Sequence, residues 1–493
     1  MPRGWPFALL PAVAVISTGC GSGAPSSPPP GSTLVHALGD PDGDGVLNSV
    51  AGLPLLPRTE LAPVAPVKRV LATWAQVSDP HIVDEESPLR VEVIDRLGGS
   101  LTSSFRPQEA LSTQVLTAAI QNVNALAPDA VLVTGDIADN AQSNELDWAI
   151  TALRGGTLTP DSGSPGYVGV QETDSADPFF YRPDIDAPRQ PGLLMRAQEA
   201  FTSPGLTAPW LPAVSNHDVL AQGLVRPDAA LGAQAVSGKK LTRPSEEATN
   251  LARRSQLDPA RIERLLTSGT LGEFRDVPAD SKRRPLAQGE AVARLAKAAS
   301  VPTQGPLLMY DREIAKGIRV VVLDTADRTG TSVGILRAPE LRWLEQTLRA
   351  HPGDQFLIVS PTPLEDTRGG DQAFKILDRT PGVVAVLAGD THRSRIRPHQ
   401  SATGGYWLVR APSLADYPQQ VRAYRLVELT DGGRALETWL IDHAGDSRQA
   451  GSIGLAGVSR DLAFLDTQGG RPRGWSGTLQ DQNATLYLPK RRA

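Results

Sequence analysis

The sequence predicts an α/β layered domain in which a substantial part of the sheet is parallel. Short runs rich in β-branched residues alternate along the chain with stretches of helical periodicity. Strands that alternate with helices in this way are typical of parallel sheets whose faces are covered by helices. The strand-like runs are VLATWAQV (70–77), AVLVTG (130–135), IRVVVLD (318–324), QFLIVS (355–360) and VVAVLAG (383–389), and the helix-like stretches are 107–127 and 339–349.

Three late apolar segments depart from this alternation. YWLVRA (406–411), VRAYRLVEL (421–429) and ALETWLI (435–441) follow one another without helices between them. Strand-like runs joined by short connections favour antiparallel pairing. We therefore expect these segments to form an antiparallel meander that closes the sheet.

Residues 219–317 form a second departure. They are charged and rich in alanine, with helix-like stretches at 244–268 and 287–300 and no strand-like apolar run. We expect a helical insertion over one end of the sheet. It either lines a substrate cleft or is a solvated excursion on the surface.

The composition bounds the class of protein. With 493 residues, of which 40% are hydrophobic and 21% are charged, the chain can form one large or two moderate domains. The formal net charge of -5 includes no basic excess, so the sequence predicts no nucleic-acid partner. The oligomeric state stays open.

The first 20 residues have the layout of an export signal. Residues 7–16 are apolar, and the small residues Ser17, Thr18 and Gly19 precede Cys20. The apolar run is far shorter than the roughly 20 residues that a membrane-spanning helix needs. Cys20 is the only cysteine, which excludes a disulfide within the chain, and its position resembles the lipid-modified cysteine of bacterial lipoproteins. We expect an exported lipoprotein anchored through Cys20 on the periplasmic or outer face of a membrane; the alternative is an ordinary signal cleaved nearby.

Residues 21–69 are expected to form a flexible tether and an N-terminal extension. GSGAPSSPPPGST (21–33) is rich in Gly, Ser and Pro and contains too little apolar surface to order itself. DPDGDG at 40–45 resembles the start of a calcium loop, because acids occupy alternate positions before a glycine. Ala51 stands where the closing Glu is required, so a polar turn is the favoured interpretation.

Metal-ligating residue types follow the predicted strands at the point where each strand ends. In open α/β sheets, ligands bind beyond the carboxyl ends of the strands. Each motif alone is weak, since a single Asp-x-His or Gly-Asp is more often turn chemistry, but three of the chain's 7 histidines stand at such ends. In chain order the strand ends carry Asp79 and His81, then Asp136 with Asp139 and Asn140, then Asn216 with His217 and Asp218, and finally Asp390 with His392.

This order of motifs resembles the calcineurin-like metallophosphoesterases, a superfamily of two-metal phosphate ester hydrolases. The shared pattern is Asp-x-His, Gly-Asp-x-x-Asp-Asn, Asn-His-Asp and Gly-x-x-His, within a domain at 70–450. The stretches 416–429, 459–466 and 481–489 also resemble a bacterial exported subgroup. The resemblance implies a four-layer αββα sandwich of two mixed β-sheets flanked by helices, with residues 451–493 as a C-terminal extension that packs on the domain.

The resemblance also implies a first metal held by Asp79, His81 and His392, with Asp136 as the carboxylate that bridges two metals. Two cations neutralise an anionic ester and lower the pKa of a bound water, which such hydrolysis needs. This donor set suits Mn, Fe or Zn.

For catalysis, the resemblance implies that His217 protonates the leaving group, because an imidazole can act as general acid near neutral pH. Asp218 would orient His217, and Asn140 would help to position phosphate.

The second metal site departs from the family pattern. SPTP (360–363) stands where the family has a histidine, so Pro361 or Thr362 occupies that place. Asp390 replaces the first histidine of the family's Gly-His-x-His, and Ser215 replaces the glycine before Asn216. The second site, with Asp136, Asn216 and Asp390 as its candidate ligands, would therefore offer only oxygen donors, which favours a weaker, hard cation such as Mn or Mg.

Two functions follow from these observations. The leading hypothesis is a metal-dependent phosphoric ester hydrolase, mono- or dinuclear, that attacks a phosphomonoester or phosphodiester with metal-activated water. The alternative is a catalytically impaired lipoprotein of the same fold, in which one metal is a structural or ligand-binding centre. The intact His217 and Asp218 favour the enzyme, whereas the lost imidazoles favour the binding protein.

Overall fold

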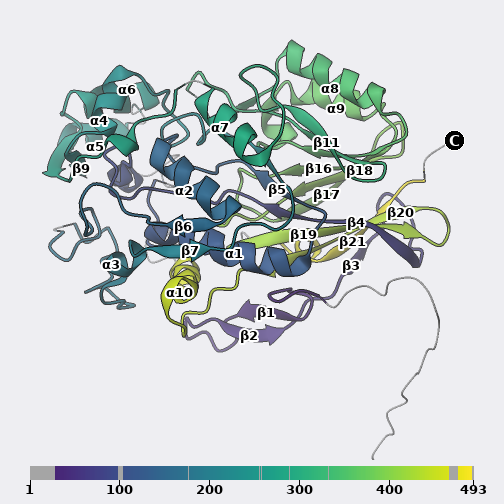
Figure 1. Ribbon diagram of the computed structural model, residues 1–493, viewed down its shortest axis with the longest axis horizontal. Coiled ribbons are helices and arrows are strands. Elements are labelled where there is room, and N and C mark those ends of the chain that lie inside the picture. The colour runs from purple at the N-terminus through teal and green to yellow at the C-terminus, as the bar shows by residue number, and fades with distance from the viewer. Residues whose placement is uncertain are drawn as a thin grey trace, which may run out of the picture.

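The computed structural model describes residues 28–97, 104–175, 177–254, 256, 258–287, 289–330, 332–465 and 476–490. Two large β-sheets lie face to face in the middle of the molecule, with helices outside them (Figure 1). The expected export signal and Cys20 lie outside the described residues. Among the described residues, no helix is long and apolar enough to cross a bilayer.

The first sheet has seven strands. They are β3 Leu56–Arg58, β4 Val67–Val77, β5 Ala130–Thr134, β8 Trp210–Ala213, β19 Gln420–Leu429, β20 Arg434–Asp442 and β21 Ala484–Leu488. Their order across the sheet is β3-β21-β20-β19-β4-β5-β8. β4, β5 and β8 are parallel, so their carboxyl ends meet at one edge, whereas β19 and β20 run antiparallel to their neighbours.

The second sheet has six strands. They are β11 Tyr310–Ala315, β12 Ile318–Val322, β14 Gln355–Val359, β16 Val383–Ala388, β17 Arg395–His399 and β18 Tyr406–Arg410. Their order is β11-β12-β14-β16-β18-β17, with four parallel central strands and an antiparallel strand at each edge. Runs such as FLIV (356–359) in β14 are apolar throughout because both faces of these central strands are covered.

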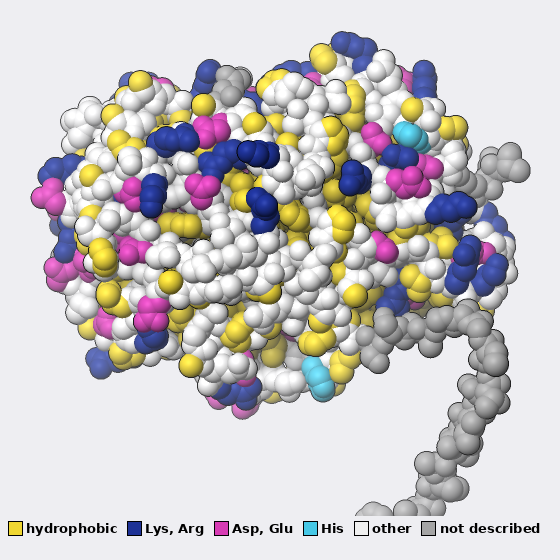
Figure 2. All heavy atoms as spheres, in the orientation of Figure 1, with side chains coloured by type: hydrophobic (Ala, Val, Ile, Leu, Met, Phe, Trp, Pro, Cys, Tyr) yellow, Lys and Arg dark blue, Asp and Glu magenta, His cyan; other side chains and the backbone are white. Residues whose placement is uncertain are grey.

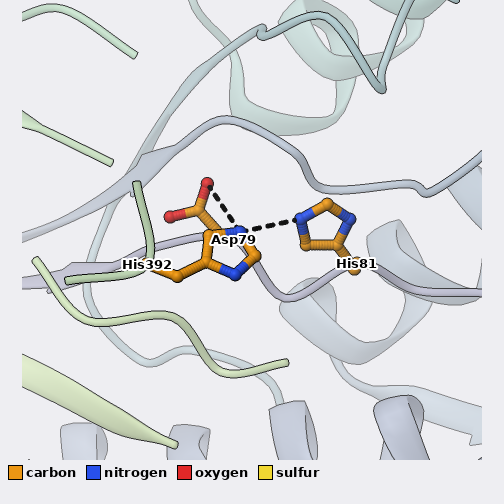
Figure 3. A group of neighbouring side chains, drawn as sticks. All are labelled: Asp79, His81 and His392. Atoms are coloured by element: carbon orange, nitrogen blue, oxygen red, sulfur yellow. Dashed lines mark hydrogen bonds and ion pairs between the residues drawn. The ribbon is translucent and has the colours of Figure 1, made fainter. Parts of the chain in front are cut away.

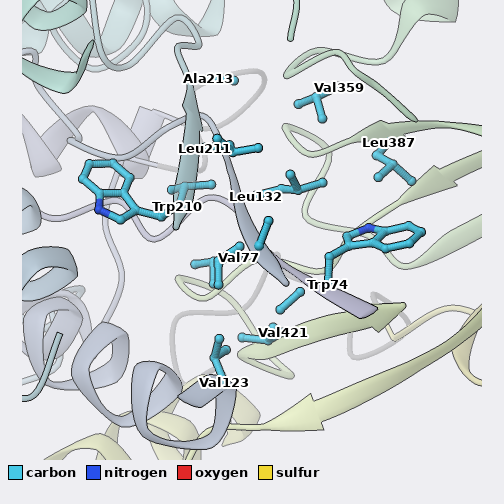
Figure 4. Close-up of a cluster of buried hydrophobic side chains, with 14 of the residues drawn as sticks. Trp74, Val77, Val123, Leu132, Trp210, Leu211, Ala213, Val359, Leu387 and Val421 are labelled. Atoms are coloured by element: carbon cyan, nitrogen blue, oxygen red, sulfur yellow. The ribbon is translucent and has the colours of Figure 1, made fainter. Parts of the chain in front are cut away.

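A buried apolar cluster joins the two sheets. Trp74 and Leu132 of the first sheet share this cluster with Val359 and Leu387 of the second (Figure 4). Gln76 in β4 crosses the interface, where its Nε2 donates to the carbonyl of Ala388 in β16 at 3.1 Å. Each large apolar side chain buried in this way stabilises the fold by roughly 1.5–3 kcal/mol.

Helices cover the outer faces of both sheets. α8 Ala338–Ala350 and α9 Gly370–Leu377 pack on the six-stranded sheet, where their apolar side chains share one buried cluster with β12, β14 and β16. α1 Ser112–Leu126, α2 Ser143–Arg154, α7 Glu290–Ala299 and α10 Gly451–Leu465 lie on the other side, against the seven-stranded sheet or against one another (Figure 1). The order of layers confirms the expected fold class, two mixed sheets flanked by helices.

The expected three-stranded meander is wrong in its pairing. β18 belongs to the six-stranded sheet and runs parallel to β16, whereas β19 and β20 belong to the other sheet. Between β18 and β19 the chain crosses from one sheet to the other. An apolar run indicates an extended, buried strand, but the strand's partner is decided by tertiary packing that the run does not encode.

Residues 219–317 are not helical throughout. They contain α4 Ala229–Ala235, α5 Glu246–Arg253, α6 Pro259–Thr267 and α7, but also β9 Lys239–Pro244, β10 Gly272–Asp276 and the edge strand β11. β9 and β10 form a separate antiparallel pair. Their sequences, KKLTRP and GEFRD, carry few apolar residues because several of their side chains are exposed or only half-buried, which is why the sequence did not predict strands.

The remaining elements are short. β1 His36–Gly39 and β2 Asn48–Ala51 form a hairpin in the region expected to be a tether and extension, and the acidic segment 40–45 lies in the loop between them. The others are β6 Gly156–Leu158, β7 Phe201–Ser203, β13 Gly334–Ile335, β15 Thr367–Arg368, α3 Leu193–Ala197, α11 Leu479–Gln482 and short 3₁₀ turns including Glu92–Leu97. On the face drawn in Figure 2, basic and acidic side chains are interspersed.

Candidate metal centre

The carboxyl ends of β4, β5 and β16 bring four of the predicted metal ligands together. His81 Nε2 lies 3.2 Å from His392 Nε2. His392 Nε2 lies 3.9 Å from Asp79 Oδ1, and His81 Nε2 lies 3.9 Å from Asp136 Oδ2. Figure 3 shows the two imidazoles directed toward one another beside the Asp79 carboxylate. All four side chains are buried, so they surround a small volume shielded from solvent.

The backbone at these strand ends is strained. Asp79, His81, Asp136, Asp390 and His392 all have positive φ, between 43° and 66°. Non-glycine residues rarely adopt this conformation, and strained backbone of this kind persists only where the surrounding structure holds it. Five such residues lie at three strand ends. Strained backbone often clusters at functional sites, where it directs side chains toward a ligand at a cost in local stability.

Two glycines allow the strand ends to approach this closely. A Cβ on Gly389 would lie 2.2 Å from Ser78 Oγ and 2.7 Å from Asp79 Oδ2. A Cβ on Gly135, whose φ is 94°, would lie 2.7 Å from the Cβ of Ser215. Any side chain at these two positions would therefore separate the elements that carry the predicted ligands.

Each candidate histidine ligand is held by a carboxylate, which is in turn held by an arginine. Asp139 Oδ1 bonds His81 Nδ1 at 2.9 Å, and Arg90 Nη1 donates to Asp139 Oδ2 at 2.7 Å. In the second arrangement, Asp416 Oδ2 lies 2.5 Å from His392 Nδ1, and Arg106 Nε donates to Asp416 Oδ1 at 2.9 Å. Metal-ligating histidines typically donate their second ring N–H to a carboxylate in this way.

These contacts determine where the ring protons lie. Burial acts to raise the pKa of Asp139, but the Arg90 guanidinium and the bond with His81 hold that pKa well below its ordinary value. An ionised carboxylate only accepts hydrogen bonds, so Nδ1 of each imidazole must be the protonated nitrogen. Burial lowers the pKa of His81 and of His392, so both rings are neutral and both Nε2 atoms carry a lone pair. Two lone pairs 3.2 Å apart repel each other unless a cation lies between them.

The carboxyls of the centre carry more negative charge than their surroundings can balance. Burial and then the charge of Asp136 raise the pKa of Asp79 well above its ordinary value. Burial raises the pKa of Asp136 to about 7, and burial followed by the charge of Asp136 raises that of Asp390 to about 7. A divalent cation would remove this cost. The donor set of two imidazoles and two carboxylates fits Zn, Fe or Mn.

His217 lies against this group of ligands. Its ring packs edge-on against His81, with ring centroids 4.5 Å apart, and its backbone N–H donates to Asp136 Oδ1 at 3.1 Å. Nδ1 bonds the carbonyl oxygen of Asp139 at 2.8 Å. The side chain is 20% exposed, more than those of His81, Asp136 and His392. His217 is therefore placed between the buried ligands and solvent.

The Asp218 carboxylate hydrogen-bonds backbone N–H groups and not the ring of His217. Its Oδ1 accepts the backbone N–H groups of Ile137 at 2.8 Å and Ala138 at 3.0 Å, and its Oδ2 accepts that of Ser215 at 2.9 Å. Asp218 thus ties the loop after β8 to the loop after β5. The expected role of Asp218 in orienting His217 stays a prediction, while the carbonyl of Asp139 is the group that bonds His217 Nδ1 in this structure.

Asn140 is buried and hydrogen-bonded within the protein. It is 0% exposed, its Nδ2 donates to Glu145 Oε1 at 3.2 Å, and its Oδ1 accepts the N–H of Gln222 at 3.1 Å. These bonds join α2 to the loop at residue 222. The expected contact with phosphate stays a prediction; in this structure both ends of the amide are used within the protein.

The candidates for a second metal are only partly free to bind one. Asn216 Oδ1 accepts from Ser215 Oγ at 3.0 Å, and its Nδ2 donates to the carbonyl of Gly223 at 3.1 Å. Asp390 donates its backbone N–H to Asp79 Oδ1 at 2.9 Å, which places its own carboxyl beside the first site. Thr362, in the segment where a histidine was expected, is buried.

Among the described residues, two other groups of three His or Asp side chains have ligand atoms within 4.8 Å of one another. One consists of His81, Asp139 and His217, but the Arg90 guanidinium 2.7 Å from Asp139 already supplies positive charge there. The other is Asp40, Asp42 and Asp44, an exposed or half-exposed set in the loop between β1 and β2.

Sequence reasoning had assigned no role to four residues that support the centre: Arg90, Arg106, Asp139 and Asp416. Asp139 stands in the GDIADN motif and Asp416 is the first residue of DYPQQ, so both belong to segments that carry the family resemblance. The arginines had no such signal, because a pairing between distant positions leaves no local pattern.

No family model matches this chain, and the search of curated proteins gave no match. Among solved structures it is similar to the sulfate thiohydrolase SoxB of Thermus thermophilus in complex with glycerol, with 14% sequence identity and a TM-score of 0.31. The alignment covers 83% of this chain and 61% of that one. At this level the similarity supports no statement about activity.

Proposed function

We propose that the protein is a metal-dependent hydrolase whose metal is held by Asp79, His81, Asp136 and His392. The observation that carries the proposal is the convergence of two imidazole lone pairs, 3.2 Å apart, between two buried carboxylates. When bound, a divalent ion supplies a Lewis acid and a water of lowered pKa. The protein's own residues fix the ligands: Asp139 and Asp416 hold the imidazoles in one tautomer.

We further propose that the substrate is a phosphoric ester, either a monoester or a diester. The support is the order of motifs, which resembles that of the calcineurin-like metallophosphoesterases, together with the place of His217. Its Nδ1 donates to the carbonyl of Asp139, so Nε2 is the nitrogen that would give a proton to a departing oxygen, and it carries that proton only when the ring is an imidazolium. A proton transfer of this kind contributes about 10²- to 10⁴-fold in rate.

The second metal in this proposal is weak. Asp136, Asp390 and Asn216 offer only oxygen atoms, and the amide of Asn216 is already hydrogen-bonded at both ends. One ion is therefore retained through purification, and a second, hard ion such as Mn²⁺ or Mg²⁺ is supplied from solution.

A second candidate function is a binding protein that keeps one metal and has lost turnover. The replacement of the expected histidine by the buried segment at Pro361 and Thr362 favours it. In either case we propose that Cys20 carries the lipid that anchors the exported chain to a membrane.

Metal analysis combined with an ester assay tests these proposals. Purified protein is assayed for bound metal and for hydrolysis of p-nitrophenyl phosphate and bis-p-nitrophenyl phosphate with added Mn²⁺. His392→Ala should lose the retained ion and the activity. The matched control is His399→Ala, since His399 stacks on Phe374 and Tyr406 and bonds Asp378 instead of a member of the centre. Stoichiometric metal without turnover supports the binding protein, and wild-type protein that binds no metal refutes the metal centre.

A further inference from the structure

Lys240 is a fully buried lysine of β9 whose ammonium is bound to one short segment of chain. Its Nζ donates to the backbone carbonyls of Glu85 at 2.7 Å, Ser87 at 3.0 Å and Arg90 at 3.1 Å. It also forms an ion pair with Glu92 Oε1 at 2.8 Å. A buried ammonium is costly unless it is paired and hydrogen-bonded, and here three carbonyls accept its N–H groups while Glu92 is its ion-pair partner. Lys240 therefore fixes the backbone between residues 85 and 92.

The fixed segment includes the arginine that supports a candidate metal ligand. Arg90 Nη1 donates to Asp139 Oδ2 at 2.7 Å, and Arg90 Nη2 forms an ion pair with Glu109 Oε2 at 2.7 Å. Asp139 in turn bonds His81 Nδ1 at 2.9 Å. A continuous series of hydrogen bonds thus runs from β9, inside the 219–317 insertion, to the imidazole of His81.

Apolar packing shows that the insertion lies directly on this segment. Leu89, Val91 and Val93 share one buried cluster with Leu241, the neighbour of Lys240 in β9. The same cluster takes in buried side chains of α4, α5 and α6, among them Leu231, Ala248, Ile262 and Leu266. The segment therefore lies between the insertion and the centre, with the insertion packed on one side and Arg90 reaching Asp139 on the other.

We propose that Lys240 is a positioning residue of the metal centre, acting through Arg90 and Asp139 on His81. This inference rests on the proposed function, in which His81 holds a metal. In metal sites, removing a group that orients a ligand typically costs about 10- to 100-fold in metal affinity. Because Lys240 acts through two intervening residues, we expect the lower end of this range, about tenfold.

The test replaces the Lys240–Glu92 pair as a unit. Lys240→Met alone leaves the Glu92 charge buried without its cation and can prevent folding. Lys240→Met with Glu92→Leu removes both charges, and replacing a buried ion pair by apolar side chains is often neutral or stabilising. Lys239→Met is the matched control, because Lys239 is the adjacent residue of β9, its side chain is 60% exposed, and it pairs with Asp276.

For each folded variant, the affinity for Mn²⁺ and for Zn²⁺ is measured by competition with a chelator. The assay temperature is well below the melting temperature of the variant. The double variant should bind metal about tenfold more weakly than wild type, and Lys239→Met should bind within about twofold of it. In an Asp139→Asn background the double variant should add less than about a twofold loss, because the connection to His81 is already weakened. A change under twofold in the wild-type background, or an equal loss in both backgrounds, would overturn the proposal.

A crystal structure of the metal-free double variant gives a readout that does not depend on metal binding. Arg90 Nη1 should move out of hydrogen-bond distance of Asp139 Oδ2, from the 2.7 Å of the wild type. An unchanged distance would overturn the positioning role. If wild-type protein binds no metal, the proposed function fails, and the position of Arg90 in this structure still decides whether Lys240 controls it.

Discussion

Metal should stabilise this protein more at pH 8 than at pH 5, because its carboxylate ligands hold protons at the lower pH. Burial raises the pKa of Asp136 to about 7, from an ordinary value of 3.8. A carboxyl whose pKa is raised on folding contributes stability that is complete below pH of about 4 and is lost as the pH rises to about 7. The metal-free protein should therefore become less stable over this interval, and a cation that binds the ionised carboxylates should reverse the loss.

The size of the effect follows from the same pKa. The gap between 3.8 and about 7 for Asp136 corresponds to roughly 4 kcal/mol, at about 1.4 kcal/mol per pKa unit. When the metal must displace one proton, its apparent affinity falls about tenfold for each pH unit below 7, hence about 100-fold at pH 5. At a fixed, saturating metal concentration this removes about 2.7 kcal/mol of stabilisation for each displaced proton.

Urea unfolding of chelator-treated protein is measured with and without Mn²⁺, at pH 5 and at pH 8. The samples without Mn²⁺ give the change in stability of the metal-free protein with pH, and the difference between the two samples at each pH gives the stabilisation by the metal. The stabilisation by Mn²⁺ should be larger at pH 8 and should disappear in His392→Ala, whereas His399→Ala should behave as wild type. Equal stabilisation at the two pH values would refute the reasoning. So would metal-free protein whose stability rises between them, because the centre would then not hold carboxyls of raised pKa.

Four further changes test individual residues. His217→Ala should leave metal content unchanged and lower turnover by about two or more orders of magnitude, and loss of metal would show that His217 is a ligand. Asp218→Ala should lower the free energy of unfolding by about 1–3 kcal/mol, because three backbone N–H groups lose their acceptor; a large loss of turnover at full stability would restore its catalytic role. Asp390→Asn should weaken activation by Mn²⁺ and spare the retained ion, as a Mn²⁺ titration with metal analysis would measure. Cys20→Ser should move the protein from the membrane fraction to the soluble exported fraction, and unchanged retention would contradict the lipid anchor.

Strand ends were the part of this protein that the sequence predicted best. Strands β4 and β16 end in the structure where their apolar runs end in the sequence. β4 ends at Val77, shortly before Asp79, and β16 ends at Ala388, shortly before Asp390. Parallel strands then bring those ends to one edge, so Asp79, His81, Asp136 and His392 meet although they are far apart in the chain.

Side-chain direction within a turn was not predictable in the same way. Asp218 follows His217 directly, and adjacency suggested contact, but the turn sends its carboxylate to backbone N–H groups of the loop after β5. Asn140 likewise turns inward to Glu145. The pairings of Arg90 and Arg106 depend on the completed fold. The sequence did not predict β9 and β10 as strands, because they lack the alternation of apolar and polar residues that indicates a half-buried strand.

The position of β21 sets the order in which the fold can be completed. β21 (Ala484–Leu488) lies between β3 and β20, so β3 reaches the seven-stranded sheet only through it. As the protein folds, β20 keeps an open edge of unpaired backbone groups until residues 484–488 pair with it. Open edges of this kind are sites of mispairing with other chains. The sheet whose strands end at Asp79 and Asp136 thus keeps an edge open to aggregation for as long as β20 has formed without β21.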